Sequence, residues 1–209
     1  AEHVLDTPRE NPFFLYLPYT IPHANSTGFW LGGDGMPVPD DAPYSNEEWP
    51  QVEKNKAAMI TRLDRDMGAL LEHLEANGLT DNTLVIFTSD NGPHKEGGVD
   101  PAFFDSTGPL RGIKRDLYEG GLRVPTIAWW PGFVTPGTVS DHQCAFWDFL
   151  VTGAELAGVA APEETDGVSF VPTLLGAEQP QHGLLYWEST EGGFSQAIRI
   201  GDWKLLRKA

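Results

Sequence analysis

Residues 83–98 read TLVIFTSDNGPHKEGG, and they open the stretch, 83–125, that decides the fold. The apolar run 84–87 favours a buried strand, and turn-forming residues replace it from Thr88 to Pro93. In open α/β sheets, ligands bind beyond the carboxyl ends of the strands. Asp90 and Asn91 are therefore predicted to lie where a ligand would be bound.

Asp90 and Asn91 place a carboxylate next to a side-chain amide. Hard oxygen donors of this kind suit Ca²⁺ or Mg²⁺. The pair Asn91-Gly92 is also a common hairpin turn, and a turn without any ligand accounts for the same residues. These residues by themselves leave both interpretations open.

Positive charge is concentrated in the next segment, GPLRGIKRDLYEGGLRVP, residues 108–125. The whole chain has only 14 Lys and Arg against 30 Asp and Glu, so a local group of cations among glycines predicts a site for a small anion. The alternative is that the cations pair with nearby carboxylates on a solvated face, which we expect of Arg115 and not of Lys114. The basic residues concerned are Lys95, Arg111, Lys114, Arg115 and Arg123, and the carboxylates are Asp105, Asp116 and Glu119.

Three segments, 89–94, 112–114 and 118–125, followed by Trp-Pro-Gly at 130–132, resemble the type I sulfatases. These are the arylsulfatase-like members of the alkaline phosphatase superfamily, and the order and spacing of the segments agree with that family. The resemblance implies hydrolysis of a sulfate ester. It also implies that Asp90 and Asn91 bind an active-site Ca²⁺, with Mg²⁺ the less expected ion, and that Lys114 binds the sulfate group.

A second strand is predicted for residues 12–20, PFFLYLPYT, which are apolar and β-favouring as in a buried parallel strand. It ends at Ile21-Pro22-His23. A single loop histidine is more often an ordinary residue than a functional one. A strand followed by Pro-His is similar, however, to the sulfatase segment whose histidine contacts the sulfate or the leaving-group oxygen. The resemblance thus implies that His23 and Lys114 are catalytic and that both, together with His94, bind the substrate.

The chain predicts an α/β fold, and the resemblance implies an alkaline phosphatase-like sandwich with a parallel-rich mixed central sheet. Strands are expected near 13–19, 83–88 and 125–130, and one long helix over 50–77. Pro50 suits the first helical position, and Gly78 suits the end of the helix. A small C-terminal antiparallel β subdomain is expected, with a hairpin over 195–206. We therefore divide the chain into a partial catalytic α/β domain, 1–180, and the start of an antiparallel subdomain, 181–209.

Composition narrows the classes of partner. The formal net charge of −16 argues against nucleic acid as a partner, and no apolar run is long enough for a membrane helix. Cys144 is the single cysteine, so no disulfide can form within the chain. The resemblance implies a sulfated small molecule or carbohydrate as the ligand, and a periplasmic or secreted location.

Two features of the family pattern are missing. Sulfatases carry a Cys/Ser-x-Pro-x-Arg motif whose first residue becomes the formylglycine nucleophile, and an Asp-Asp pair after the first strand of their fold. Neither is present in these 209 residues. We therefore expect a fragment that lacks the N-terminal formylglycine segment and is inactive by itself. The alternatives are a phosphate or phosphonate ester hydrolase of the same superfamily, and a non-catalytic remnant that acts as a binding protein.

Overall fold

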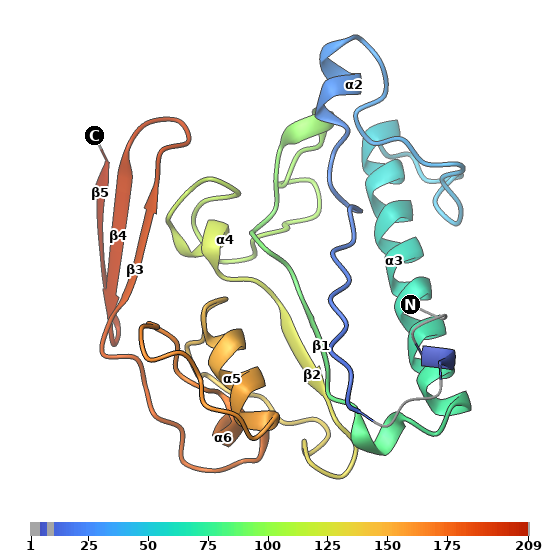
Figure 1. The fold of residues 1–209 in the computed structure, drawn as a ribbon. Helices are drawn as coiled ribbons and strands as arrows, with labels where there is room; N and C mark the ends of the chain where they lie inside the picture. Colours follow the sequence, from blue (N-terminus) through green and yellow to red (C-terminus); the bar gives the residue numbers. More distant parts are fainter. Residues whose placement is uncertain (1–4, 8–10, 209) are drawn as a thin grey trace. The chain divides into compact units, whose positions relative to one another are not determined.

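The computed structural model describes residues 5–7 and 11–208 (Figure 1). The chain forms two compact units, the first comprising 1–80 and 91–123, and the second comprising 81–90 and 124–209. The elements of the first unit are α2 (Ser26–Trp30), α3 (Gln51–Ala76), η2 (Glu96–Gly98) and α4 (Glu119–Leu122). Those of the second are η1 (Thr80–Asn82), which begins at the boundary, β1 (Val85–Thr88), β2 (Thr126–Trp129), α5 (Asp148–Leu156), α6 (Val171–Leu174), β3 (Leu185–Ser189), β4 (Ser195–Ile200) and β5 (Trp203–Lys208). No helix in the described part of the chain is long and apolar enough to cross a membrane.

Helix α3 confirms the predicted long helix. Pro50 is its N-cap, one position before the predicted one, and Gly78 follows its end with a φ of +64°. The apolar side chains that recur at three- and four-residue steps along this helix are only partly covered: Leu74 is buried, but Ile60 is 47% exposed. The buried residues cluster instead in the first half of the helix, where Met59 joins a core with Ala24, Met36 and Val99.

Helix α3 also buries two charged side chains, Glu53 and Lys56, which are 2% and 7% exposed. The Glu53 Oε1 atom accepts a hydrogen bond of 2.6 Å from the backbone N–H of Asp100. Burial lowers the pKa of the Lys56 ammonium, although the nearby charges of Glu53 and Asp100 act in the opposite direction. The bond to Asp100 fixes the segment that follows η2 on the surface of α3.

The strand predicted for residues 12–20 is not assigned as a strand in the described part of the chain. Burial nevertheless alternates along it: Phe13 and Leu15 are half-buried, whereas Phe14 and Tyr16 are 90% and 73% exposed. This period of two indicates an extended backbone. The predicted burial on both faces is therefore wrong, because alternate side chains are exposed, and no strand is assigned to this segment in the described residues.

Strands β1 and β2 confirm the predicted positions, but they form a two-stranded antiparallel sheet (Figure 1). The register pairs Val85 with Trp129 and Thr88 with Thr126. The parallel-rich central sheet is therefore not confirmed. An apolar run suggests burial on both faces and hence a parallel strand, yet all four residues of β1 are only half-buried. Strand direction depends on the connection, and the connection here contains only the short elements η2 and α4.

The C-terminal sheet confirms the predicted antiparallel strands. Strands β3, β4 and β5 pair in that order, and the pair Ile200–Trp203 encloses a two-residue turn, as predicted for the hairpin. The division of the chain at 180–181 stays a prediction.

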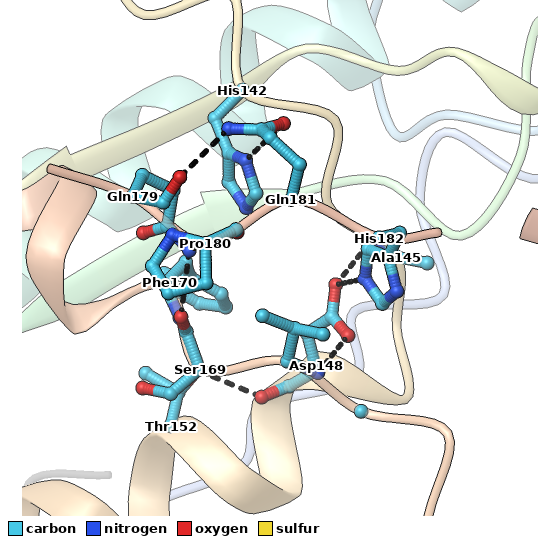
Figure 2. A network of polar contacts seen from close by, with 12 residues as sticks. His142, Ala145, Asp148, Thr152, Ser169, Phe170, Gln179, Pro180, Gln181 and His182 are labelled. Atoms are coloured by element: carbon cyan, nitrogen blue, oxygen red, sulfur yellow. Dashed lines mark hydrogen bonds and ion pairs between the residues drawn. The ribbon is translucent and has the colours of Figure 1, made fainter. Parts of the chain in front are cut away.

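A buried carboxylate organises the helical part of the second unit (Figure 2). Asp148, at the start of α5, is fully buried, and its two oxygens accept hydrogen bonds from the backbone N–H groups of Ala145 and Val168. The Asp148 Oδ2 atom also lies 3.0 Å from Nε2 of His182. Asp148 therefore links α5 to residues 168 and 182, far along the chain.

Candidate anion-binding site

Lys114 lies in a tight turn. The N–H of Asp116 donates to the carbonyl oxygen of Ile113 over 2.8 Å, and Arg115 occupies the third position with a φ of +80°. The Asp116 carboxylate also accepts a hydrogen bond from the Ile113 N–H. The backbone N–H of Lys114 itself donates to the Pro93 carbonyl over 2.9 Å. The turn is thereby held beside the segment that follows Asn91.

Two glycines allow this close backbone approach. The Gly92 N–H donates to Gly121, and the Gly120 N–H donates to Arg111, over 2.9 and 2.8 Å. A Cβ atom at Gly120 would lie 2.1 Å from the carbonyl oxygen of Gly112, and one at Gly92 would lie 1.9 Å from that of Gly120. Any side chain at these positions would force the segments apart.

The side chains of His23 and Lys114, 91 positions apart in sequence, meet at 3.0 Å between Nε2 and Nζ. The His23 Nδ1 atom lies 2.8 Å from the carbonyl oxygen of Ala24. A carbonyl oxygen only accepts, so Nδ1 carries a proton. In the neutral ring, Nε2 therefore holds a lone pair that accepts a hydrogen bond from the Lys114 ammonium.

Glu96, from η2, completes the cluster. Its Oε2 atom lies 3.5 Å from Lys114 Nζ and 3.8 Å from His23 Nε2, and its Oε1 atom contacts Nη1 of Arg115. Burial raises the pKa of the Glu96 carboxyl, but the hydrogen bond from Arg115 and the charge of Lys114 outweigh burial and lower it. Sequence reasoning missed Glu96, although an acid within a cation-rich segment was a usable signal.

His94 connects the segment that leads to His23 with the segment that contains Glu96. Its Nδ1 atom accepts a 3.2 Å hydrogen bond from the Glu96 N–H, so Nε2 carries the proton and donates to the Pro22 carbonyl over 3.3 Å. Its ring centroid lies 5.8 Å from that of His23. Burial is the main cause that lowers the pKa of His94, which favours this neutral form. With both ring nitrogens bonded to backbone, direct substrate binding by His94 stays a prediction.

Asp90 and Asn91 lie where β1 ends. Asp90 is exposed, and Asn91 is half-buried with its amide nitrogen donating to the Gly92 carbonyl over 2.8 Å. Within residues 5–7 and 11–208, no three His, Cys, Asp or Glu side chains gather as a metal site. The pair therefore fits a hard cation as part of a shell and not as a complete one.

Of the five basic residues predicted to form the anion site, Lys114 and Arg115 contact Glu96 in the structure. Arg111 lies over the ring of Tyr118 at 3.9 Å, while Lys95 and Arg123 are exposed. Arg115 was expected to pair with a nearby carboxylate on a solvated face. Its side chain is 45% exposed and does pair with a carboxylate, but that carboxylate is Glu96, which it shares with Lys114.

The cluster can therefore bind an anion and move a proton. Lys114 supplies a positive charge that is largely shielded from solvent, since its side chain is 15% exposed. His23 supplies an Nε2 atom that lies 3.0 Å from the Lys114 ammonium. Such an arrangement suits a reaction in which an anionic group is held while an adjacent oxygen gains a proton.

Comparisons with known proteins agree with one another on the family of this chain. The family model described as Sulfatase matches residues 1–159, and the model described as N-sulphoglucosamine sulphohydrolase, C-terminal, matches residues 112–207. Arylsulfatase A of Homo sapiens is 38% identical over 206 residues, covering 94% of this chain and 36% of that protein. The chain spans about a third of the length of the curated relatives it matches.

Two solved structures are similar in fold. The structure of Ps i-CgsB in complex with k-i-k-neocarrahexaose has a TM-score of 0.81 and 31% identity, and the match covers 100% of this chain and 43% of that one. The structure of BT4656 in complex with its substrate D-glucosamine-2-N,6-O-disulfate has a TM-score of 0.63 and 28% identity, over 76% of this chain and 32% of that one.

Proposed function

The chain belongs to the sulfatase family, and on that premise we propose that it forms part of an enzyme that hydrolyses sulfate esters. The observation that supports the proposal most directly is the approach of His23 Nε2 to Lys114 Nζ at 3.0 Å. Two residues 91 positions apart are brought together at the ends of segments that carry the family motifs.

Each of the two residues has a distinct role in the proposal. Hydrolysis of a sulfate monoester cleaves an S–O bond, and negative charge develops on the SO₃ group and on the leaving oxygen. The Lys114 ammonium holds the anionic group and stabilises that charge. The proton that the attacking oxygen nucleophile loses passes to the His23 Nε2 atom, which then gives it to the leaving oxygen. The Nδ1–H bond to Ala24 fixes the ring so that Nε2 faces the reacting group.

The proposal includes two components that this chain does not supply in full. Asp90 and Asn91 would contribute oxygen ligands to a Ca²⁺ ion, and the remaining ligands would come from elsewhere in the protein. When bound, the cation supplies positive charge next to the sulfate oxygens. A formylglycine nucleophile would also come from sequence beyond these 209 residues, which contain no Cys/Ser-x-Pro-x-Arg motif.

We further propose that the parallel-rich central sheet of the fold is completed by sequence beyond this chain. Phe14 and Tyr16, in the extended segment 12–20, are 90% and 73% exposed. Large side chains in a regular extended segment are normally covered. Strands from the remaining two thirds of such a protein would cover them, since the matched relatives are about three times as long.

The proposed substrate is a sulfated carbohydrate or another small sulfate ester. The family model that matches residues 112–207 is that of an N-sulphoglucosamine sulphohydrolase, and the similar protein BT4656 was solved with a disulfated glucosamine as its substrate. A periplasmic or secreted location belongs to the same proposal, since it rests on the family resemblance.

The test is hydrolysis by the complete protein that contains this chain. Release of p-nitrophenol from p-nitrophenyl sulfate, and release of inorganic sulfate from sulfated monosaccharides, should both be measured beside p-nitrophenyl phosphate. The proposal expects a kcat/KM for the sulfate ester at least about 100-fold above that for the phosphate ester. Preference for phosphate would indicate a phosphoester hydrolase, and binding of sulfate without turnover would indicate a binding protein.

A further inference from the structure

We propose that Arg115 is a positioning residue of the anion site, and that it neutralises Glu96 so that the positive charge of Lys114 remains for a monoanionic sulfate ester. This inference rests on the proposed function and adds to it a residue that touches neither substrate nor metal. It follows from the charges of the cluster, the backbone conformation at residue 115 and the burial of the groups concerned.

The first step is the net charge of the cluster formed by His23, His94, Glu96, Lys114 and Arg115. Lys114 and Arg115 each carry one positive charge, Glu96 carries one negative charge, and the hydrogen bonds of His23 and His94 indicate neutral rings. Over these five side chains the sum is one net positive charge, which matches the single negative charge of R–O–SO₃⁻; the Asp116 carboxylate in the same turn, which accepts the Ile113 N–H, is not counted. Without Arg115 the sum would be zero, and Glu96 would compete with the substrate for Lys114.

The two oxygens of Glu96 interact differently with Arg115 and Lys114, and this limits how strongly Glu96 competes with the substrate for Lys114. Oε1 contacts the Arg115 guanidinium, whereas Oε2 is 3.5 Å from Lys114 Nζ, at the outer limit of a hydrogen bond. A guanidinium holds a carboxylate more firmly than an ammonium does, because its donors form a fixed fork. Glu96 thereby orients the Lys114 ammonium through a long hydrogen bond, and the ammonium can still bind an anion.

The backbone at residue 115 indicates that this side chain is required. Arg115 has a φ of +80° at the third position of a four-residue turn, which is where turns of this kind normally carry Gly or Asn. A non-glycine residue in that conformation is strained, and such strain persists where the surrounding structure or the function requires the residue. Glycine would relieve the strain and remove the charge in one substitution.

Burial makes the charge balance effective. The side chains of Glu96 and Lys114 are 18% and 15% exposed, so solvent screens their interaction less than it would at the surface. The Arg115 side chain reaches them from a more exposed position, 45% exposed. An uncompensated carboxylate at this depth would repel an approaching anion at short range.

The test uses three variants of the complete protein: Arg115→Gly, the double variant Glu96→Gln/Arg115→Gly, and Arg65→Gln as a control. Arg65, on α3, has a side chain that is 68% exposed and pairs with Asp66, so its loss removes one positive charge away from the site. For Arg115→Gly we expect a KM for p-nitrophenyl sulfate and a Kd for inorganic sulfate roughly ten-fold higher, with kcat changed by less than about three-fold. Its circular dichroism spectrum should match that of the wild type, which separates a loss of sulfate affinity from a loss of fold.

The double variant decides between charge balance and a structural role. It restores one net positive charge with no side chain at 115, so sulfate affinity should return to within about three-fold of the wild type. The inference is overturned if Arg115→Gly binds sulfate as well as the wild type does, or if the double variant binds no better than Arg115→Gly. Sulfate binding that follows this pattern in a protein without hydrolysis would uphold the inference while refuting the proposed function.

Discussion

At the scale of single residues, the hydrogen bonds of the site determine which atoms can react. The Ala24 carbonyl keeps a proton on His23 Nδ1, and this leaves Nε2 as the reactive nitrogen. The Glu96 N–H keeps Nδ1 of His94 unprotonated. Each imidazole thus has one defined tautomer, and only that of His23 presents a lone pair to Lys114.

The first prediction concerns His23 and Lys114. In the complete protein, His23→Ala and Lys114→Ala should each lower kcat/KM for p-nitrophenyl sulfate by about 10²–10⁴-fold, because one removes the proton carrier and the other the stabilising charge. Circular dichroism should show an unchanged fold. Arg65→Ala, which removes an exposed charge on α3, serves as the control. A loss of less than about three-fold at Lys114 would mean that the anion is held elsewhere.

The second prediction concerns the pH dependence of stability. The pKa of His94 is lowered from 6.5, chiefly by burial, so the folded state binds fewer protons than the unfolded state just below pH 6.5. The contribution of neutral His94 to the free energy of unfolding is therefore fully present above about pH 6.5. It is lost as the pH falls through the lowered pKa of His94. Urea denaturation of the wild type and of His94→Asn, followed from pH 7.5 to pH 5, measures the difference in the free energy of unfolding.

In His94→Asn the side-chain oxygen can still accept the Glu96 N–H, while the titrating group is gone. The variant should therefore lose less stability than the wild type over this pH range. The lowered pKa of Glu96 affects stability only below its ordinary value of 4.5, outside the window measured. Equal pH slopes for the two proteins would show that His94 is not held in its neutral form.

At the scale of elements, the sequence predicted the positions of the helices and strands better than their partners. Helix α3, strands β1 and β2 and the C-terminal hairpin all lie where periodicity and turn residues placed them. Periodicity carries no information on the direction of a neighbouring strand, so the antiparallel pairing of β1 with β2 was not foreseen. His23 and Lys114 were found through family motifs, whereas Glu96 had no motif, and its role depends on a contact with Arg115 that only the folded turn creates.

The third prediction concerns the backbone contacts that hold the Lys114 turn in place. Gly120→Ala should destabilise the protein by at least about 2 kcal/mol, because its Cβ atom would lie 2.1 Å from the Gly112 carbonyl, a clash between backbone segments that cannot relax cheaply. It should also lower kcat/KM. Gly68→Ala, in the middle of α3 with open space around its Cβ atom, should instead stabilise by about 0.5–1 kcal/mol. Thermal denaturation of both variants would reveal the contrast, and equal effects would contradict it.

At the scale of the whole molecule, a small cationic site works within an acidic protein. The chain carries a net charge of −16, which disfavours the approach of any anion over distances shorter than the screening length. The single net positive charge of the cluster must therefore act at short range, where burial strengthens it. A cation bound by Asp90 and Asn91 would add further positive charge. Metal binding should therefore be measured in the complete protein.

The last prediction concerns that metal. A Ca²⁺ ion takes six to eight oxygen ligands, and this chain offers the Asp90 carboxylate and the Asn91 amide oxygen, with no larger His, Cys, Asp or Glu group in the described ranges 5–7 and 11–208. Two ligands leave most of the hydration shell in place, so the 209-residue chain should bind Ca²⁺ no tighter than about 1 mM. Isothermal titration of this chain would contradict the prediction if it gave a micromolar Kd.

The complete protein should behave differently, because further ligands would close the shell. There, Ca²⁺ should raise the melting temperature in proportion to its occupancy, and Asp90→Asn should abolish most of that shift. Asp66→Asn, an equivalent change on the exposed side of α3, should leave the shift intact. Since removing either oxygen donor weakens the same shell, Asn91→Ala should also reduce the shift, but by less than Asp90→Asn, because an amide oxygen contributes no charge. A calcium-induced shift that survives both substitutions would place the ion on other residues.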